Sequence, residues 1–330
     1  MKIYHTGSLE PGYNLACEEW LLRDTDDDAF MLWQNAPVVV IGRNQNAYAE
    51  VDLDALARAG ATLIRRITGG GAVYHDLGNV NFSYITSREK ADALDFAYFT
   101  APVIEALASL GVTAKLSGRN DLLAQLPDGD WAKISGNAAT ATATRTLHHG
   151  TLLFDSDMSV LGSVLRPDDE KLRAKKIASV RSRVTNIRPL LRTDTDTPGF
   201  LRELERFMVA RLGLEPADLP EDVIRRTDYY RRNIREEYIY GGTDEFSESR
   251  RVRTEGGTMV IRFDERDGRI ARLRLEGDFF GTFSAEGLEQ ALLGMTLRPA
   301  PVLPEDLDPE RYMKGLTREL LAELLARQPE

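Results

Sequence analysis

The spacing of apolar residues in the first third of the chain predicts amphipathic helices that alternate with short buried strands. An apolar stripe at helical spacing follows Asn14, which is expected to cap this helix. The unbroken apolar run 38–41 predicts a buried strand that ends at Gly42. The other elements predicted here are helices over 52–60, capped by Asp52, and over 95–110, with strands over 62–67 and 80–86.

Strand patterns dominate the middle of the chain. Turn-forming Gly, Asn and Asp residues separate predicted strands over 112–116, 121–126, 131–135 and 147–154, and a predicted helix follows over 199–212. Because these strands cluster between separated helices, the pattern favours an α+β fold over a doubly wound parallel sheet.

The C-terminal part has the pattern of a small separate unit. Two alternating segments flank the turn dipeptide Asp267-Gly268 and predict a hairpin of strands over 258–263 and 269–275, followed by helices over 284–292 and 316–325. The charged and aromatic stretch 228–248 is interpreted as a linker. We therefore predict two domains, 1–245 and 246–330.

Composition and charge narrow the class of protein. The 330 residues are 42% hydrophobic, and the run 38–41 is the longest aliphatic stretch, so no membrane partner is expected. A net charge of −10 opposes general binding of nucleic acid, so no nucleic-acid partner is expected. The single cysteine, Cys17, excludes an intramolecular disulfide and, with no apolar secretion signal at the start, favours the cytoplasm. Its simplest role is that of a small buried apolar residue.

The densest cluster of candidate chemistry is the stretch 65–79, in which Arg65 and Arg66 precede Gly69-Gly70-Gly71 and His75-Asp76 follow. Glycines leave backbone amides open to a ligand, successive N–H groups can bind one anion, and arginines add bidentate donors. The stretch lacks the G-K-[ST] of a Walker A loop and opens no helix as a dinucleotide fingerprint does. It is either an anion site or a wide hairpin turn with solvated arginines, and the clustering favours a site.

A second cluster combines residues 117–121 with residues 133–138. Lys133 lies in a short predicted strand that ends in Ser-Gly-Asn, where its ammonium is a candidate point charge for a carboxylate or phosphate. Asp121 is a candidate oxygen ligand for Mg²⁺. The alternative for both is an ordinary surface residue.

Histidines and basic residues complete the candidates. His148 and His149 are adjacent in a predicted strand, so they point to opposite faces and cannot form a metal pair. The chain contains no C-x-x-C or H-x-x-x-H pair, so no structural zinc site is expected. The run 171–192 carries eight Lys or Arg residues and no acid. It is interpreted as a loop that closes over a phosphate-bearing intermediate, with a solvated helix face or an RNA-binding patch as alternatives.

Together these strings resemble the lipoate–protein ligase A family. They occur in the family's order over about residues 10–190, and five such strings in order are specific where one alone is not. The strings are R-R-x-x-G-G-G-A-V-Y-H-D-L-G-N (65–79), S-G-R-N-D (117–121), K-I-S-G-N-A (133–138), H-H-G-T-L-L (148–153) and S-V-R-S-R-V-T-N (179–186). The string G-D-F-F-G (277–281) resembles the accessory domain of some members.

The resemblance implies a catalytic domain of the biotin/lipoate ligase type, with sheets flanked by helices, and a small accessory domain. It implies that lipoate and ATP, with Mg²⁺, first give lipoyl-adenylate and pyrophosphate. A lysine of a lipoyl domain then accepts the acyl group as an amide. The implied protein partners are the lipoyl domains of 2-oxoacid dehydrogenase E2 subunits and the glycine cleavage H protein.

The resemblance also implies roles for individual residues. Lys133 is the implied catalytic residue, which would hold the lipoate carboxylate and then the adenylate phosphate. The nucleotide would be bound by Arg66, Gly71, Ala72, Val73 and Tyr74, lipoate by Arg66 and His75, and Mg²⁺ by Asp121, while Lys175, Arg181 and Arg183 would belong to the loop that closes over the adenylate.

The junction between the predicted domains departs from the family pattern. Many members carry a Trp-x-Trp-rich segment there, whereas residues 235–242 read R-E-E-Y-I-Y-G-G. The resemblance therefore does not settle how the accessory domain docks or moves between the two half-reactions. It also leaves the choice between lipoate and octanoate open.

Three other functions stay open. A transferase that moves octanoyl or lipoyl groups between carriers needs a cysteine nucleophile, and Cys17 alone is present. A biotin ligase would carry a loop of the G-R-G-R-x-G-R type, which residues 68–72 lack. A non-catalytic lipoyl- or nucleotide-binding protein would keep the anion-binding residues without turnover.

Overall fold

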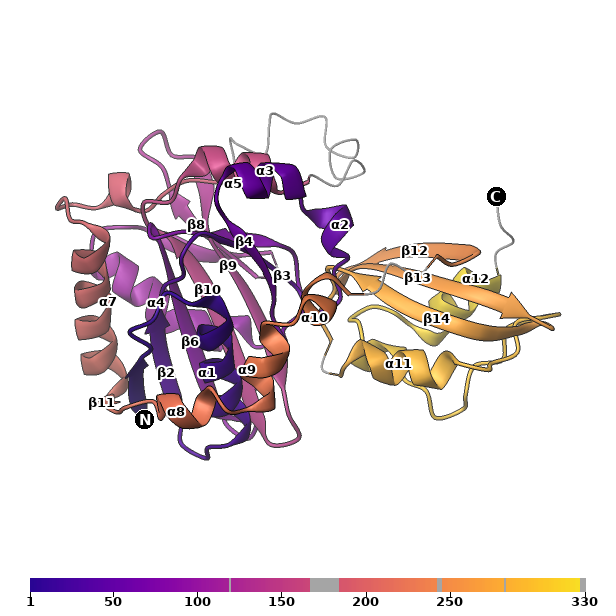
Figure 1. Cartoon of the computed structure of the whole chain (residues 1–330). Helices are drawn as coiled ribbons and strands as arrows, with labels where there is room; N and C mark the ends of the chain where they lie inside the picture. Colours follow the sequence, from indigo (N-terminus) through magenta and orange to yellow (C-terminus); the bar gives the residue numbers. More distant parts are fainter. Residues whose placement is uncertain (119, 167–183, 242–244, 282, 327–330) are drawn as a thin grey trace.

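Two β-sheets and their covering helices form the larger body of the protein, and a third sheet with two helices forms a C-terminal unit, residues 248–326, beside it (Figure 1). The computed structural model describes residues 1–118, 120–166, 184–241, 245–281 and 283–326. The α+β class is confirmed, because most strand pairs are antiparallel and the helices lie between groups of strands in the sequence. Lys175, Arg181 and Arg183 lie outside the described residues.

The large sheet has eight strands. In spatial order they are β11 (Glu215–Pro216), β1 (Lys2–His5), β2 (Ala29–Trp33), β6 (Asn79–Ser87), β10 (Arg145–Leu153), β9 (Trp131–Ala141), β8 (Asp121–Gln125) and β7 (Ala114–Ser117). β1 is parallel to both of its neighbours, and the other pairs are antiparallel. The four strands predicted between 112 and 154 are confirmed, although β9 and β10 extend further than predicted. β6 and β10 pair along their whole length and form the buried centre of the body.

The small sheet has the order β4 (Thr62–Arg65), β3 (Val38–Ile41) and β5 (Val73–His75). β3 is wholly buried, as its unbroken apolar run predicts, and it pairs parallel with β4 and antiparallel with β5. Since β3 lies between β4 and β5, the glycine-rich residues 66–72 cross over it. The alternative of a simple hairpin turn is therefore wrong.

Helices cover the sheets and connect them. They are α1 (Pro11–Arg23), α2 (Ala47–Glu50), α3 (Leu53–Arg58), α4 (Phe96–Ser109), α5 (Met158–Val164), α7 (Thr197–Leu212), α8 (Glu221–Ile224), α9 (Asp228–Asn233) and α10 (Glu236–Tyr240), with a 3₁₀ turn η2 (Arg188–Leu190). Asp52 caps α3 as predicted, and Asp95 caps α4. Within the described part of the chain, no helix is both long and apolar enough to cross a membrane.

The predicted cap of the first helix is wrong. α1 begins at Pro11, whose fixed φ suits the first helical position, so Asn14 lies one turn inside the helix. Its buried side chain Nδ2 instead donates to the carbonyl oxygens of Ser8 and Gln34 and to Asn35 Oδ1. Asn14 thus ties α1 to the end of β2.

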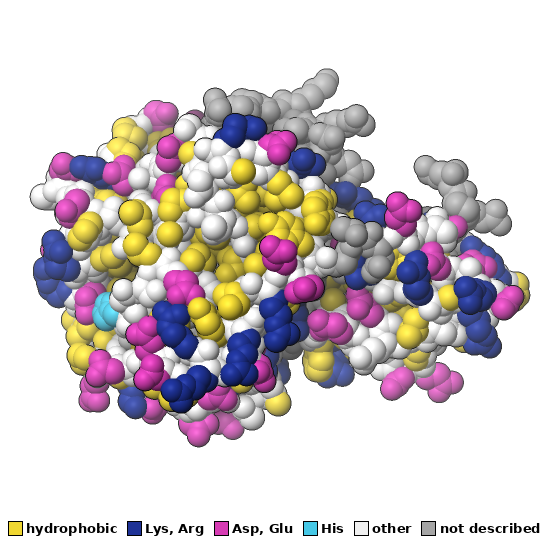
Figure 2. Space-filling model, in the orientation of Figure 1, with side chains coloured by type: hydrophobic (Ala, Val, Ile, Leu, Met, Phe, Trp, Pro, Cys, Tyr) yellow, Lys and Arg dark blue, Asp and Glu magenta, His cyan; other side chains and the backbone are white. Residues whose placement is uncertain are grey.

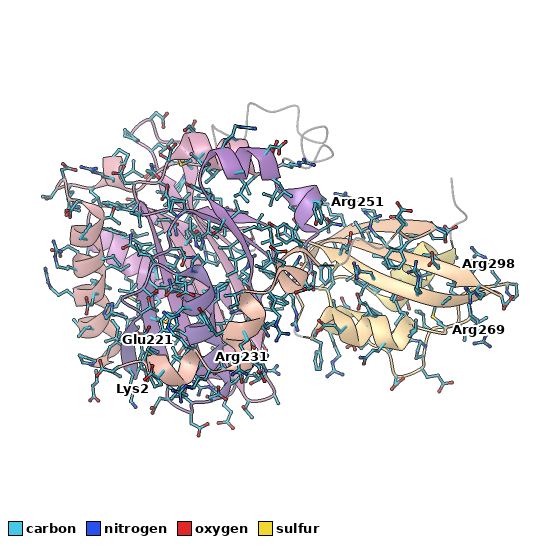
Figure 3. The ribbon with its side chains drawn as sticks, viewed as in Figure 1. Lys2, Glu221, Arg231, Arg251, Arg269 and Arg298 are labelled. Carbon is cyan, nitrogen blue, oxygen red and sulfur yellow. The ribbon has the colours of Figure 1, made fainter. Side chains whose placement is uncertain are left out.

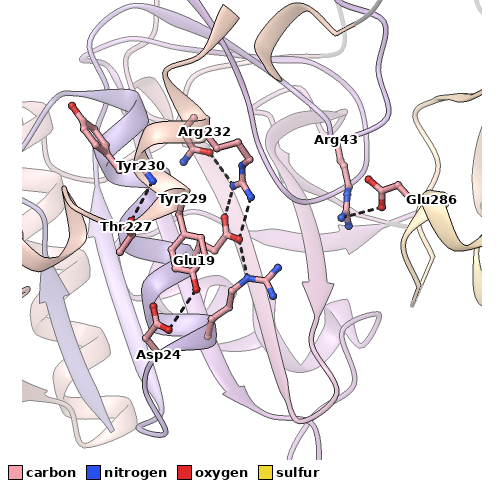
Figure 4. Close-up of polar contacts among 10 residues, drawn as sticks. Glu19, Asp24, Arg43, Thr227, Tyr229, Tyr230, Arg232 and Glu286 are labelled. Atoms are coloured by element: carbon pink, nitrogen blue, oxygen red, sulfur yellow. Dashed lines mark hydrogen bonds and ion pairs between the residues drawn. The ribbon is translucent and has the colours of Figure 1, made fainter. Parts of the chain in front are cut away.

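Much of the predicted linker is folded onto the body. α9 packs against α1, and Arg232 Nη2 donates to the buried carboxylate of Glu19 at 2.5 Å, while the Tyr229 hydroxyl donates to Asp24 (Figure 4). α8 lies at the same surface, where Figure 3 labels Glu221 and Arg231, and Figure 2 shows basic side chains gathered there. The interpretation of 228–248 as a linker is therefore wrong up to the end of α10, because a charge-rich sequence here forms ion pairs with α1.

The C-terminal unit has its own core. Its sheet is β12 (Glu248–Thr254), β13 (Gly257–Arg266) and β14 (Arg269–Gly277), and the predicted hairpin at Asp267-Gly268 is confirmed. The helices α11 (Ala285–Leu292) and α12 (Arg318–Ala326) supply apolar side chains to this core, and a 3₁₀ turn η3 (Pro309–Arg311) lies between them. The boundary near residue 245 stays a prediction.

Candidate functional site

A cavity lies between the large and the small sheet. It brings together most of the residues predicted for the site, namely Arg66, Gly71, Ala72, Val73, His75 and Lys133. Its wall also includes the buried apolar side chains of Leu15, Trp33 and Val40. The one-third exposed side chain of Lys133 marks the mouth, and the buried apolar side chains mark the inner end.

Arg66 shapes the glycine loop (residues 69–71) from inside. Its guanidinium is buried and donates to Thr68 Oγ1 and to the backbone carbonyls of Val40, Gly69 and Gly71, at 2.6–3.0 Å. Four donations to the protein leave this cation little capacity for a phosphate, but its charge stays in the cavity wall. Burial lowers the pKa of Arg66 to about 10, which leaves it protonated at neutral pH.

Arg65 is not part of the cavity wall. Its side chain points away from Arg66, as alternation along an extended backbone requires, and donates to five backbone carbonyls. These belong to Gly42, Arg43, Gln45, Tyr238 and Ile239. The interpretation of both arginines as ligand-binding donors is therefore wrong for Arg65, which joins β4 to α10.

Lys133 and Asp121 lie on the neighbouring strands β9 and β8. Lys133 Nζ is 2.7 Å from Asp121 Oδ1, and both side chains are about one-third exposed. A Cβ at Gly136 would lie 3.3 Å from the same Nζ, so this glycine leaves room for the lysine side chain. The backbone of Lys133 also receives a hydrogen bond from Thr185 N, so the first residues after the undescribed segment lie against it.

His75 is a neutral donor in the cavity wall. Asn14 Nδ2 donates to Asn35 Oδ1, which turns Asn35 Nδ2 towards His75 Nδ1 at 3.1 Å. Nδ1 is then the acceptor and Nε2 carries the proton. Burial, with the charge of Arg66 adding to it, lowers the pKa of His75 to about 3, so the ring stays neutral. Among the described residues nothing accepts from Nε2, a buried donor that a ligand can satisfy.

The two adjacent histidines face opposite sides of β10, as predicted. His148 is stacked on Phe99 at 4.8 Å and belongs to the core, where burial holds its pKa well below the usual value. His149 lines the cavity, with Nε2 2.9 Å from Thr68 Oγ1 and Nδ1 2.8 Å from the buried Glu18. His149 Nδ1–H donates to the Glu18 carboxylate, and Thr68 Oγ1, which accepts from Arg66, lies within hydrogen-bond distance of Nε2.

Two predicted residues are placed differently. Tyr74 lies between Val73 and His75 on β5, so its side chain points to the opposite face and packs with the apolar cluster under α3. A nucleotide-binding role for that side chain does not fit. Asp121 lies beside Lys133 at the mouth, and the described residues contain no group of three or more potential metal-ligating side chains.

Sequence reasoning missed several lining residues. Asn137 Nδ2 donates to the carbonyl oxygen of Asn120, while Asn120 Nδ2 donates to that of Asn137, which fixes β9 beside β8 at the mouth. Both asparagines lie inside strings quoted above, so their position in those strings was the available signal. Trp33 and Asn81 carried no such signal, since they come from β2 and β6, and only the tertiary structure brings them to the cavity.

Comparisons with known proteins agree with this geometry. Residues 10–208 match the family model of the lipoyl protein ligase A/B catalytic domain, and residues 243–325 match that of the bacterial lipoate protein ligase C-terminus. The chain is 34% identical over 327 residues to the lipoate-protein ligase LplJ of Bacillus subtilis, which covers 96% of this chain and 97% of that protein.

Solved structures share the fold. The TM-score is 0.71 to the complex of P. falciparum LipL1 with lipoate, at 23% identity over 89% of this chain and 90% of that one. It is 0.59 to a lipoate-protein ligase A bound with ATP, at 27% identity over 73% and 98% of the two chains. The predicted resemblance is therefore confirmed, and the chain belongs to the lipoyl protein ligase A/B family.

Proposed function

We propose that the protein is a lipoate–protein ligase, which activates lipoate with ATP to lipoyl-adenylate and transfers the lipoyl group to a lysine of a lipoyl domain. The observation that carries the proposal is a single cavity with an apolar inner end, a neutral histidine donor and a cationic mouth. The similarity over nearly the whole length of LplJ supports it.

The cavity fits an acid with an apolar tail. Leu15, Trp33 and Val40 offer apolar surface to the tail, and the half-open Lys133 ammonium offers a charge to the carboxylate. In the cavity wall, His75 Nε2–H is a buried donor without an acceptor among the described residues. The arrangement therefore orients the acid with its head at the mouth.

Adenylation requires the carboxylate to attack the α-phosphate of ATP, so two anions must approach each other. Lys133 and the charge of Arg66 lower this repulsion from fixed positions, and the backbone of Gly71 and Ala72 lies open beside them. A Mg²⁺ ion would offset charge on the pyrophosphate leaving group. A single protein carboxylate suffices for Mg²⁺ bound mainly by phosphates, and Asp121 at the mouth fits that part.

Transfer requires the adenylate to stay away from water until the acceptor lysine arrives. We propose that the segment with Lys175, Arg181 and Arg183 closes over it. The described residues on its C-terminal side support this, because Val184 pairs with Lys133 and Thr185 N donates to the Lys133 carbonyl. The acceptor amine then attacks the acyl carbon and AMP leaves.

The transferase alternative is disfavoured by the state of Cys17. The thiol is fully buried in α1, outside the cavity wall, and burial raises its pKa to about 12. A thiol held protonated cannot serve as the nucleophile of a carrier-to-carrier transfer.

The partners and compartment are proposals of the same kind. We propose lipoyl domains of 2-oxoacid dehydrogenase E2 subunits and the glycine cleavage H protein as acceptors, and the cytoplasm as the location. The name of LplJ, a lipoate-protein ligase, supports a protein acceptor. The single buried cysteine supports the location.

Two assays test the function. Lipoate-dependent exchange of pyrophosphate into ATP is expected for a ligase and absent for a transferase or a binding protein. An apo lipoyl domain incubated with the protein, ATP, Mg²⁺ and lipoate should gain the mass of one lipoyl amide. Exchange without any gain of mass would contradict the second half-reaction.

A further inference from the structure

The glycine loop is covered from outside by the C-terminal unit. A Cβ built on Gly69 would lie 2.5 Å from Phe279 O, and one on Gly70 would lie 2.6 Å from Phe280 Cζ. A Cβ on Gly71 would meet nothing within 4 Å. Gly69 and Gly70 are therefore glycines because another part of the protein packs on them, and Gly71 alone stays open to a ligand.

Phe279 and Phe280 are adjacent but belong to different cores. Phe279 is buried in the core of the C-terminal unit, whereas Phe280 is buried in a cluster of the body that includes Phe96, Ala138 and Ala139. The rings of Phe280 and Phe96 are 5.9 Å apart with an edge-to-face geometry. The C-terminal unit thus inserts one aromatic ring into the body.

The Phe280 ring lies next to two parts of the cavity wall. It approaches Gly70, whose neighbour Gly71 lines the cavity, and it shares a buried cluster with Ala138, which lines the cavity itself. The loop is also held from within, because Arg66 Nη2 donates to the carbonyls of Gly69 and Gly71. The loop backbone is therefore fixed between a guanidinium inside and an aromatic ring outside.

Other contacts keep the C-terminal unit in this place. Gly277 N donates to Asn44 O at 2.8 Å, and Arg43 forms an ion pair with Glu286 (Figure 4). Asn46 Nδ2 also donates to Glu276. These bonds align the end of β14 with the loop after β3, which places Phe280 on the glycine loop.

We propose that Phe280 is a positioning residue for the acid-binding cavity: carried by the C-terminal unit, it sets the shape of the glycine loop that forms part of the cavity wall. The inference rests on the proposed function and deepens it. Phe280 is not among the residues that line the cavity, so its removal should loosen the cavity without removing a reacting group. The expected signature is weaker binding of lipoate with a smaller change in turnover at saturation.

The test compares Phe280→Ala with wild type and with Phe283→Ala, a matched control. Phe283 is an exposed aromatic residue of the same unit that contacts Arg311 and Tyr312, and it is not a member of the buried cluster that holds Phe280. Lipoate binding is measured by calorimetry without ATP, and the KM for lipoate by pyrophosphate exchange. We expect Phe280→Ala to raise both Kd and KM about tenfold, the usual size of a coupling between sites, and Phe283→Ala to leave both unchanged.

The conservative variant Phe280→Leu should restore most of the binding, because it refills the same space. It also keeps the test decisive if Phe280→Ala does not fold. Phe280→Leu should then bind lipoate at most several-fold more weakly than wild type. Unchanged Kd in a folded Phe280→Ala protein would overturn the inference. Absence of exchange activity in the wild type would overturn the proposed function instead.

A double-mutant cycle tests the contact itself. Gly70→Ala places a Cβ against the Phe280 ring and also strains a backbone with φ +88°, but the strain is present with or without the ring. Gly70→Ala should therefore weaken lipoate binding several-fold more in the presence of Phe280 than in the Phe280→Ala background. Equal effects in the two backgrounds would show that Phe280 does not act through the glycine loop.

Discussion

At the scale of single residues, most of the cationic side chains that the sequence places near the site donate hydrogen bonds to backbone carbonyls. Arg65 and Arg66 donate mainly to carbonyl oxygens, so they hold loops together. Lys133 differs, because its ammonium pairs with the solvent-accessible carboxylate of Asp121 and can exchange this partner for a substrate anion. Of these three cations, Lys133 has the fewest hydrogen bonds to the protein, and it is thus the one suited to catalysis.

Replacement of Lys133 by alanine tests that role. The Lys133→Ala protein should lose lipoate-dependent pyrophosphate exchange by ~10²–10³-fold, the usual effect of removing a group that stabilises developing charge. Its unfolding midpoint should stay near that of wild type, because a partly exposed surface ion pair contributes little stability. Lys115→Ala is a matched control, since Lys115 on β7 lies over the Trp131 ring, outside the cavity. Near-normal exchange in Lys133→Ala would contradict the assignment.

The buried neutral histidines predict a dependence of stability on pH. Burial lowers the pKa of His75 to about 3 and that of His148 well below its usual value, while unfolding returns both to about 6.5. The unfolded state therefore binds more protons below pH 6.5, and the free energy of unfolding falls as the pH falls towards 3. His75 alone should account for a loss of about 2 kcal/mol between pH 7 and pH 5.

Urea unfolding at pH 7, 6 and 5 measures this loss. A variant with His148 replaced by leucine should show a shallower decrease over the same range, even if it is less stable at pH 7. A free energy of unfolding that is constant or rises from pH 7 to pH 5 would contradict the assignment of both rings as neutral.

At the scale of secondary-structure elements, single polar side chains decide how segments far apart in the sequence meet. Arg65 on β4 reaches carbonyls in the loop after β3 and in α10, and Asn14 on α1 reaches the end of β2. The segment predicted as a linker is held the same way, by Arg232 and Glu19 between α9 and α1. Charge-rich stretches here form specific contacts between elements.

Arg65→Lys should destabilise the protein although it keeps the charge. A lysine ammonium cannot reproduce the planar fork that reaches carbonyls of two elements, so several buried acceptors lose their donor. We expect a loss of about 3 kcal/mol in the free energy of unfolding. Arg231→Ala, which removes an exposed ion pair with Asp228, is the control and should change it by less than about 0.5 kcal/mol. Equal stability of Arg65→Lys and wild type would contradict this account.

At the scale of the whole molecule, the core of the C-terminal unit meets the body at an inserted aromatic ring. The C-terminal core contains its own strands and helices, and the body has separate clusters on both sides of its large sheet. Phe280 is the residue of the C-terminal unit found in a cluster of the body. A loss of stability in the C-terminal unit should therefore affect the glycine loop while the centre of the body stays unchanged.

Leu288→Ala tests this arrangement. Leu288 is fully buried in the C-terminal core, and its truncation should destabilise that unit by ~2–5 kcal/mol. Hydrogen exchange should become faster in β12–β14 and in residues 69–71, while β6 and β10 keep their protection. Faster exchange throughout the body, or no change at the glycine loop, would contradict the separation of the two cores.

The sequence by itself determined the element types and the local chemistry of this protein. The apolar run of β3, the Asp52 cap of α3 and the hairpin at residues 267–268 depend on neighbours within a few residues, so periodicity and turn chemistry were sufficient. Alternation along a strand likewise separated His148 from His149.

The tertiary structure decided which side chains meet and what each is free to do. Trp33 and Asn81 reach the cavity only through strand order, and Tyr74 leaves it because β5 turns that side chain to the other face. Gly69 and Gly70 were predicted to leave room for a ligand, but the C-terminal unit packs on them. Long-range packing and the competition of backbone carbonyls for buried donors are not encoded in local spacing, and for that reason these assignments required the folded chain.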